Sequence, residues 1–206
     1  MARMMDMENR IQEGPAVTLT PTDVMALEIP DEVLSADDKQ AVAQAAMKQW
    51  GFSGVGVRRN DSWAGVALVS PVIPRAHPLS AAGLDEGTAG LILVQIGSRV
   101  PFDYGQGIGI SKRLCTGLGR RLRNQVSSIE AQTTPGTTTA LTPSPAWLVR
   151  MGFQPMRYPL GRYRLDLSSM VAWVHKALAW HPYPSFALKG QTASRTAQSA
   201  VSETLS

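Results

Sequence analysis

The chain has 206 residues, 44% of them hydrophobic, which is enough for one domain with a sizeable core and loose ends. No apolar run approaches the ~20 residues that cross a bilayer, and residues 1–14 lack the apolar stretch of a secretory signal. With one cysteine, Cys115, and a modest net charge of +4, the chain forms no internal disulfide and no cysteine-only metal site, and we expect a cytoplasmic protein.

The N-terminal region predicts one short strand followed by one helix. Alternating β-branched residues at 17–20 are typical of a strand. Ser35 and the acidic residues behind it are typical of a helix start, since they complement the N-terminal end of the helix dipole. We expect this helix to run to about residue 49 and to end at Gly51.

Three strands are expected between residues 53 and 96. The segments 53–59 and 63–70 predict a hairpin that turns at residues 60–61. A loop rich in proline and glycine follows at 71–87. The next segment, 88–96, reads Thr-Ala-Gly-Leu-Ile-Leu-Val-Gln-Ile, and its unbroken apolar character predicts a central strand that is covered on both faces.

The middle of the chain carries a glycine-rich stretch, Gly105-Gln106-Gly107-Ile108-Gly109. A helix is expected behind it to about residue 124, because four apolar residues recur every four positions: Ile110, Leu114, Leu118 and Leu122. A further strand is predicted at 126–132. Since one crossover helix links two strands, those strands are expected to be parallel.

The C-terminal third predicts a short helix at 145–151 that Gly152 ends. A final strand pair is expected at 157–158 and 163–167. Ser168 or Ser169 begins a last predicted helix at 170–181, and the tail from residue 189 has the composition of a disordered segment.

A strand, a glycine-rich loop and a helix N-terminus together form an anion site, because backbone N–H groups and the helix dipole point at the ligand. The P-loop pattern is excluded, since Lys112 is preceded by Ser111 and followed by Arg113. The dinucleotide pattern is excluded as well, because Ile110 and Lys112 occupy the two possible positions of its third glycine.

The charge distribution also favours an anionic ligand at this helix. No acidic residue lies between Asp103 and Glu130, whereas residues 21–38 are biased toward acids. A local basic field attracts a polyanion, which is either a nucleic acid or a phosphate-rich cofactor. The basic residues of the segment are Lys112, Arg113, Arg120, Arg121 and Arg123.

The stretch from Tyr104 to Gly109 resembles the motif Gln/Arg-x-x-Gly-x-Gly/Ala of the GNAT superfamily, the acetyl-CoA-dependent N-acyltransferases. The resemblance continues at 146–153, Ala-Trp-Leu-Val-Arg-Met-Gly-Phe, which is similar to the family's short helix ending in Gly-Phe. It closes at 163–167, which is similar to the last strand of the family, and it covers residues 15–168.

The resemblance implies an α+β fold of three α/β layers. Helices flank a twisted, mixed and mostly antiparallel sheet of six to seven strands, which is splayed at the fourth and fifth strands. The implied cofactor is acetyl-CoA or another short acyl-CoA. The implied cofactor-binding residues are Val94, Gln95 and Ile96 on the fourth strand, then Tyr104, Gly105, Gln106, Gly107, Ile108, Gly109, Ile110, Ser111 and Arg113.

The resemblance further implies N-acetyl transfer by direct attack of an amine on the thioester through a tetrahedral intermediate. Two positions depart from the family, with Tyr104 in place of Gln or Arg and Leu148 in place of a Tyr that often acts as the acid. The candidate base is Glu130, whose alternative is a structural ion pair, and the candidate acids are Tyr158 and Tyr163, whose alternative is half-buried strand aromatics.

Two other functions stand beside this one. A catalytically degenerate protein of the same fold, binding acyl-CoA as a sensor or structural element, is favoured by Tyr104 and Leu148. A nucleic-acid-binding domain that uses the arginine-rich helix is a remote alternative, since no aromatic residues interleave with the arginines.

The expected organisation is a disordered segment at 1–14, an acyltransferase-like domain at 15–168, a C-terminal helix at 169–182 and a flexible tail at 183–206. The helix is expected to pack on the domain or on a partner. We expect a small-molecule or protein amine as the acceptor, no nucleic acid, membrane or metal ion, and a monomer or homodimer.

Overall fold

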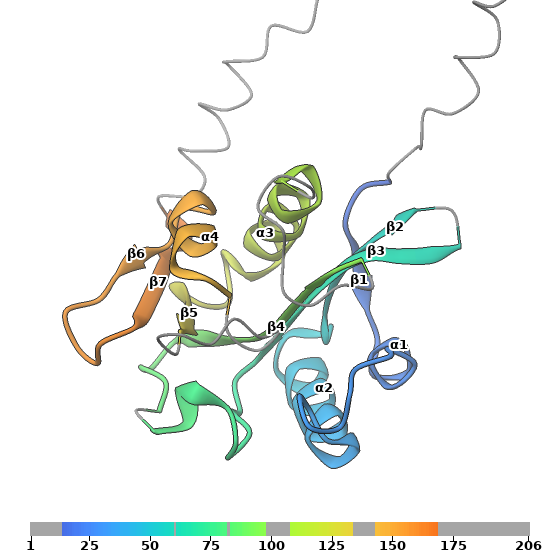
Figure 1. Cartoon of the computed structure of the whole chain (residues 1–206), viewed down its shortest axis with the longest axis horizontal. Coiled ribbons are helices and arrows are strands. Elements are labelled where there is room, and N and C mark those ends of the chain that lie inside the picture. The colour runs from blue at the N-terminus through green and yellow to red at the C-terminus, as the bar shows by residue number, and fades with distance from the viewer. Residues whose placement is uncertain (1–13, 60, 82, 98–107, 134–142, 169–206) are drawn as a thin grey trace, which may run out of the picture. The chain divides into compact units, whose positions relative to one another are not determined.

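A seven-stranded sheet runs through the fold in the order β1-β2-β3-β4-β5-β7-β6 (Figure 1). Every neighbouring pair is antiparallel except β4 with β5. This mixed, mostly antiparallel sheet flanked by helices confirms the expected fold class. The strands are β1 (Val17–Leu19), β2 (Gly54–Arg59), β3 (Ser62–Ser70), β4 (Thr88–Ile96), β5 (Ser128–Gln132), β6 (Gln154–Pro155) and β7 (Arg162–Asp166).

The structure is a computed structural model, and all the residues that it describes lie in Met1–Ala172, the first of two compact units of the chain. The predicted helix at 170–181 and the tail behind it lie outside the described residues, as do residues 1–13. The described ranges are 14–59, 61–81, 83–97, 108–133 and 143–168.

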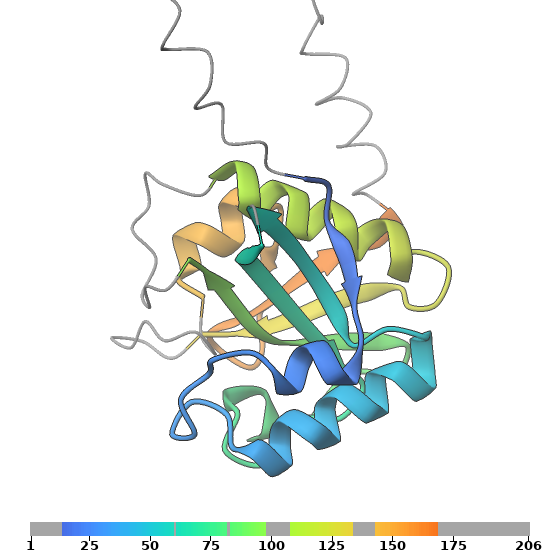
Figure 2. The same cartoon turned by 90° about the vertical axis from the view of Figure 1, so that its right-hand side faces the viewer.

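Helices cover both faces of the sheet (Figures 1 and 2). On one face lie α1 (Pro21–Met25), α2 (Ala36–Trp50) and a short 3-10 helix, η1 (Pro78–Ala81). On the other lie α3 (Ile108–Leu122) and α4 (Pro145–Arg150). The sheet is therefore the middle of three layers.

Two clusters of buried apolar side chains correspond to these faces. The predicted stripe of α3 packs in one cluster with Val94 of β4 and Leu148 of α4. Val42 of α2 packs in the other cluster with Ile92 and Leu93 of β4. Because β4 contributes to both clusters, it is the central strand that its apolar sequence predicted.

The connection from β4 to β5 passes through α3, and the two strands are parallel, as the sequence predicted. The observed bounds of β4 are those predicted, and its first seven residues are buried. Parallel strands need such a crossover because the chain has to return to the same edge of the sheet before the second strand begins.

The predicted ends of α2 are confirmed. The hydroxyl oxygen of Ser35 accepts a hydrogen bond from the Asp38 backbone N–H at 3.2 Å, which satisfies one of the unpaired donors of the first turn. Gly51 ends the helix with a φ of 79°, a left-handed conformation that a residue without a Cβ adopts at low cost.

Helix α1 was not predicted from the sequence. Thr20, expected as the last residue of a strand, is the N-cap of this helix. Its backbone N–H donates to Asp23 at 2.8 Å and its hydroxyl accepts from the Asp23 N–H at 3.2 Å, while Pro21 begins the helix. The hydrogen bond from the Thr20 side chain holds the pKa of the Asp23 carboxyl below its usual range.

The strand predicted at 157–158 is wrong. The partner of β7 is instead β6, where Gln154 pairs with Arg164 and Pro155 with Tyr163. Residues 157–158 lie in the connection between β6 and β7. A turn hydrogen bond of 3.2 Å from the Arg162 N–H to the Pro159 carbonyl closes this connection. Proline is tolerated in β6 because β6 is an edge strand, where one side of the backbone needs no ladder partner.

Candidate functional site

β4 and β5 separate soon after they meet. Their pairing covers only three positions, from Thr88 opposite Ser128 to Gly90 opposite Glu130. Beyond it, β4 stays paired with β3 and β5 stays paired with β7. We call this separation, between residues 91–96 of β4 and 131–132 of β5, the fork; it confirms the expected splay.

A bulge in β4 lies where the fork begins. Leu68 of β3 pairs with Leu93, but the next residue of β3, Val69, pairs with Leu91, so Ile92 is an extra residue. Leu68, Ile92 and Leu93 all belong to the cluster below α1 and α2. Two successive side chains on one face are typical of a bulge, and a bulge bends its strand and increases its twist.

After the bulge, alternate residues of β4 direct their backbone groups toward the fork. The Gly97 N–H donates to the Ala64 carbonyl of β3 at 2.8 Å. Because backbone groups in a strand alternate in direction, Gln95 also points its N–H toward β3, whereas Val94 and Ile96 point theirs toward the fork. Two of the three implied β4 residues are thus placed to offer backbone hydrogen bonds.

The first turn of α3 lies beside this end of β4. A Cβ added at Gly65 would lie 2.5 Å from Ile110 Cγ2 and 3.4 Å from Ile96 Cγ1, so both side chains meet above this glycine. The N–H groups of a first helical turn have no partner within the helix, and they attract anions. Gly109 in that turn is exposed, and a Cβ there would meet no atom within 4 Å.

The side chains of the α3 residues that the resemblance implied have protein partners. Ile110 is buried in the core, and the buried Ser111 hydroxyl accepts a hydrogen bond from Trp147 Nε1 of α4 at 3.0 Å. Arg113 donates to the Gly14 carbonyl at 3.4 Å. Contacts to a phosphate from this turn would therefore come from the backbone. Tyr104, Gly105, Gln106 and Gly107 lie outside the described residues, and Ile108 begins α3.

Glu130 forms a buried ion-pair network at the closed end of the fork. Its carboxylate accepts hydrogen bonds from Arg162 and from Arg164, whose Nε lies 3.0 Å from Oε1. Arg162 also donates to the Gly83 carbonyl at 2.7 Å, and Arg164 pairs with Asp85. The hydrogen bond with Glu130 raises the pKa of the Arg164 guanidinium. Both carboxylate oxygens are thus bound to cations, which is the structural alternative considered for Glu130.

The three catalytic candidates are not gathered at one point. Tyr163 is half-buried on β7, opposite Ala131, so β5 lies between it and the fork. Tyr158 is 81% exposed in the connection between β6 and β7. Leu148, at the position where the resemblance expects a Tyr, is fully buried. Catalytic roles for Glu130, Tyr158 and Tyr163 stay predictions.

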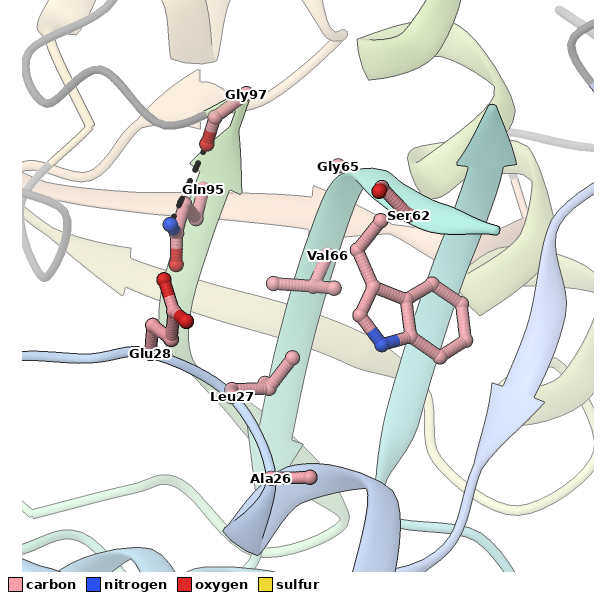
Figure 3. Close-up of a pocket in the computed structure, with 9 residues that line it drawn as sticks. Ala26, Leu27, Glu28, Ser62, Gly65, Val66, Gln95 and Gly97 are labelled. Carbon is pink, nitrogen blue, oxygen red and sulfur yellow. Dashed lines mark hydrogen bonds between the residues drawn. The ribbon is translucent and has the colours of Figure 1, made fainter. Parts of the chain in front are cut away.

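A pocket of about 380 Å³ opens on the α1 side of β4 (Figure 3). The side chains of Glu28 and Gln95 point toward one another at one wall, and Leu27 lies beside Val66 (Figure 3). Trp63 also lines the pocket, and the Arg58 guanidinium lies 4.5 Å from its ring centroid. The remaining lining residues are Ala26, Ser62, Gly65 and Gly97, so none of the described lining residues is basic.

This pocket was not predicted from the sequence. Its members come from three separate stretches, 26–28, 62–66 and 95–97. The only signal in the sequence was the acidic bias of residues 21–38, which includes Glu28.

Comparison with known proteins gives matches to solved structures alone, since no family model matches the chain and no curated protein matches its sequence. A GNAT family acetyltransferase from Brucella melitensis in complex with acetyl-CoA is 16% identical, over 76% of this chain and 88% of that chain, with a TM-score of 0.45. The aminoglycoside acetyltransferase AAC(6′)-Ib in complex with coenzyme A and kanamycin is 14% identical, over 77% and 97%, with a TM-score of 0.46. NAA60 of Arabidopsis thaliana in complex with acetyl-CoA is 13% identical, over 73% and 98%, with a TM-score of 0.47.

The similarity to these proteins is one of fold, at low identity and with TM-scores below 0.5. Within the described ranges, no helix is long and apolar enough to cross a membrane.

We expect substitutions in the ion-pair network to lower the free energy of unfolding by unequal amounts. Arg162→Met should lower the free energy of unfolding by about 3–5 kcal/mol, because it leaves the fully buried Glu130 with one guanidinium fewer. Asp85→Asn is the control and should cost about 1 kcal/mol or less, since Asp85 is 55% exposed. Urea unfolding measures both, and equal costs would contradict a structural role for the buried pair.

Cys115 is predicted to be inert in the folded protein. It is buried on α3, and desolvation raises the pKa of its thiol to about 12. At pH 8 the thiolate, which is the reactive form, is then depleted roughly a thousandfold relative to an unfolded cysteine. A thiol reagent should label Cys115 rapidly in denaturant and only at the rate of unfolding without it; fast labelling of the native protein would show the thiol to be accessible.

Proposed function

We propose that this chain is an acyl-CoA-dependent N-acyltransferase that transfers an acetyl or other short acyl group to an amine. The observation that carries the proposal is the fork, whose β4 edge directs the backbone N–H groups of Val94 and Ile96 away from β3 beside the first turn of α3. An extended acyl-pantetheine arm has amide and thioester carbonyls that can pair with such an edge as a strand would.

The phosphate end of the same ligand suits the start of α3. The first-turn N–H groups of α3 are directed at an anion by the helix geometry, and the helix dipole adds to the attraction. Gly109 fits this role because the space around its Cα is open, so a phosphate can approach the backbone closely. The bonds of Ser111 and Arg113 to other parts of the protein make the backbone, rather than those side chains, the source of the contacts.

Acyl-CoA supplies a thioester: the amine forms a C–N bond to the acyl carbon, the C–S bond breaks, and the sulfur ends with the proton that the amine gives up. The chain's own contribution is to hold the thioester carbonyl. A backbone N–H fixed by a sheet needs no reorganisation when charge develops on that oxygen, which is why such donors stabilise transition states strongly. Val94 is proposed as the donor, because it follows the bulge at the opening of the fork.

The pocket beside α1 is the proposed acceptor site. Gln95 lines this pocket, while the backbone N–H groups of its neighbours Val94 and Ile96 point toward the fork. β4 therefore connects the acceptor pocket with the fork. The Glu28 carboxylate attracts the ammonium form of an amine, and the Trp63 ring offers an aromatic wall to the carbon skeleton. We therefore propose a cationic amine that carries an apolar group next to its nitrogen.

A non-catalytic acyl-CoA-binding protein remains the alternative, and a specific observation favours it. Glu130 is held by two guanidinium groups, and Leu148 is buried in the core, so neither offers an acid or a base at the fork. Release of CoA in the presence of cationic amines separates the two functions, because a sensor binds acyl-CoA but releases no CoA.

Gly109→Val tests the cofactor site. In the wild type, acetyl-CoA at a hundred times its Kd should add about 2.7 kcal/mol of stability, which corresponds to a Tm rise of roughly 5–10 °C for a domain of this size. The introduced valine side chain should abolish that rise by blocking the phosphate, while the Tm without ligand changes little. Gly14→Val is the matched control, since a Cβ there also meets no atom within 4 Å.

Thermal unfolding with acetyl-CoA, CoA and ATP checks this result. The proposal fails if the wild type shows no shift with either CoA compound, or if ATP gives an equal shift. An unchanged acetyl-CoA shift in Gly109→Val would refute the placement of the phosphate at α3.

Glu28→Gln tests the acceptor site. Removing the charge should lower kcat/KM about 3–10-fold for cationic arylalkyl amines such as tyramine, because the ammonium loses one charge-assisted contact. The acetyl-CoA shift should stay unchanged, since Glu28 follows α1, which lies on the opposite face of the sheet from α3. Glu32→Gln, exposed and outside the pocket, is the control and should match the wild type; an equal loss in both variants would point to a general electrostatic effect.

A further inference from the structure

The bulge in β4 creates a backbone carbonyl that needs a partner. Ile92 is the extra residue of the bulge, and an extra residue is left without a ladder partner on the neighbouring strand. Its side chain is fully buried, so the carbonyl lies in a region where an unpaired oxygen is costly. The partner is a side chain from the loop before β4: His77 Nε2 lies 3.1 Å from the Ile92 oxygen.

The other ring nitrogen fixes the direction of this hydrogen bond. His77 Nδ1 accepts from the backbone N–H of Leu79 at 3.1 Å. A neutral imidazole whose Nδ1 accepts carries its proton on Nε2, so Nε2 donates to the Ile92 carbonyl. The ring is 2% exposed, and the His77 backbone is held in turn by bonds to Pro74 and Ser80 at the start of η1.

The loop that carries His77 also packs against the point where the fork begins. Gly90 is the last residue of β4 that pairs with β5. A Cβ added at Gly90 would lie 2.3 Å from Ile73 Cδ1 and 3.5 Å from Leu79 Cδ1, so this loop contacts the β4 backbone closely there. The loop therefore contacts β4 on both sides of Leu91, at Gly90 through packing and at Ile92 through His77.

We propose that His77 is a positioning residue for acyl transfer, which holds the Ile92 carbonyl so that the bulge directs the Val94 N–H into the fork. The inference rests on the proposed function. The Ile92 carbonyl and the Leu93 N–H belong to one peptide plane, and Val94 is the next residue, so the orientation of that plane affects the path of β4 where it enters the fork. His77 touches neither the thioester nor the amine in this scheme; it acts through the backbone.

Two substitutions separate the two hydrogen bonds of the ring. His77→Gln places an amide nitrogen near the position of Nε2 and can still donate to Ile92. His77→Asn places its amide oxygen near the position of Nδ1 and can still accept from Leu79, but it is too short to reach Ile92. Both variants lose the ring and its packing, so a difference between them reports on the bond to the bulge.

The readout is the ratio of the Kd for CoA to the Kd for acetyl-CoA, measured by calorimetry. Only acetyl-CoA has the thioester carbonyl that the Val94 N–H would bind, whereas both compounds share the pantetheine and phosphate contacts. We expect the wild type and His77→Gln to prefer acetyl-CoA, and His77→Asn to lose that preference by about 3–10-fold with its Kd for CoA unchanged. In turnover with tyramine, His77→Asn should lose kcat while the KM for the amine stays the same.

The outcomes that would overturn the inference are distinct. If the wild type binds neither CoA nor acetyl-CoA, the proposed function fails and this inference fails with it. If the wild type binds both but His77→Asn keeps the full preference for acetyl-CoA, only the role of His77 is refuted. Loss of affinity for both compounds in equal measure would show a purely structural role.

A measurement on the wild type keeps the inference testable if His77→Asn does not fold. In protein labelled with ¹⁵N-histidine, the Nε2–H signal of His77 should exchange slowly with solvent. It should shift when acetyl-CoA binds and stay in place when CoA binds. An Nε2–H signal that does not shift when acetyl-CoA binds, or a ring that carries its proton on Nδ1, would overturn the proposal.

Discussion

The separation of β4 from β5 is the constraint on which the rest of the site depends. The two strands pair over three positions, and the bulge at Ile92 then turns β4 away while β3 continues to hold it. Parallel neighbours in a sheet normally satisfy each other's backbone groups. Here the edge of β4 behind the bulge has no strand partner on the fork side among the described residues, and that edge is what a ligand of extended, amide-rich shape can use.

Buried polar contacts at the closed end of the fork and at the bulge hold the fork open. At the closed end, the Glu130 carboxylate joins β5 to β7 through Arg162 and Arg164. At the bulge, the buried His77 satisfies the carbonyl that the extra residue leaves unpaired. Both arrangements bury polar groups whose hydrogen bonds are costly to lose, so each one favours a single geometry of the strands.

Much of the fold was accessible from local patterns in the chain. The apolar run at 88–96 gave the bounds of β4, and the four-residue spacing from Ile110 to Leu122 gave the buried face of α3. The prediction failed where local signals were ambiguous: Thr20 caps a helix rather than ending a strand, and the partner of β7 lies at Gln154 and Pro155. A two-residue edge strand has too few residues to show any period.

The sequence by itself determined the type and order of the main elements and the charge bias of the two halves, because caps, periodicity and composition act over a few neighbouring residues. Only the tertiary structure decided which side chains meet. Glu130 joins Arg162 across 32 residues, His77 meets a carbonyl 15 residues away, and the pocket unites Glu28 with Gln95. No spacing rule encodes such meetings, since they follow from the strand order, the register and one extra residue in β4.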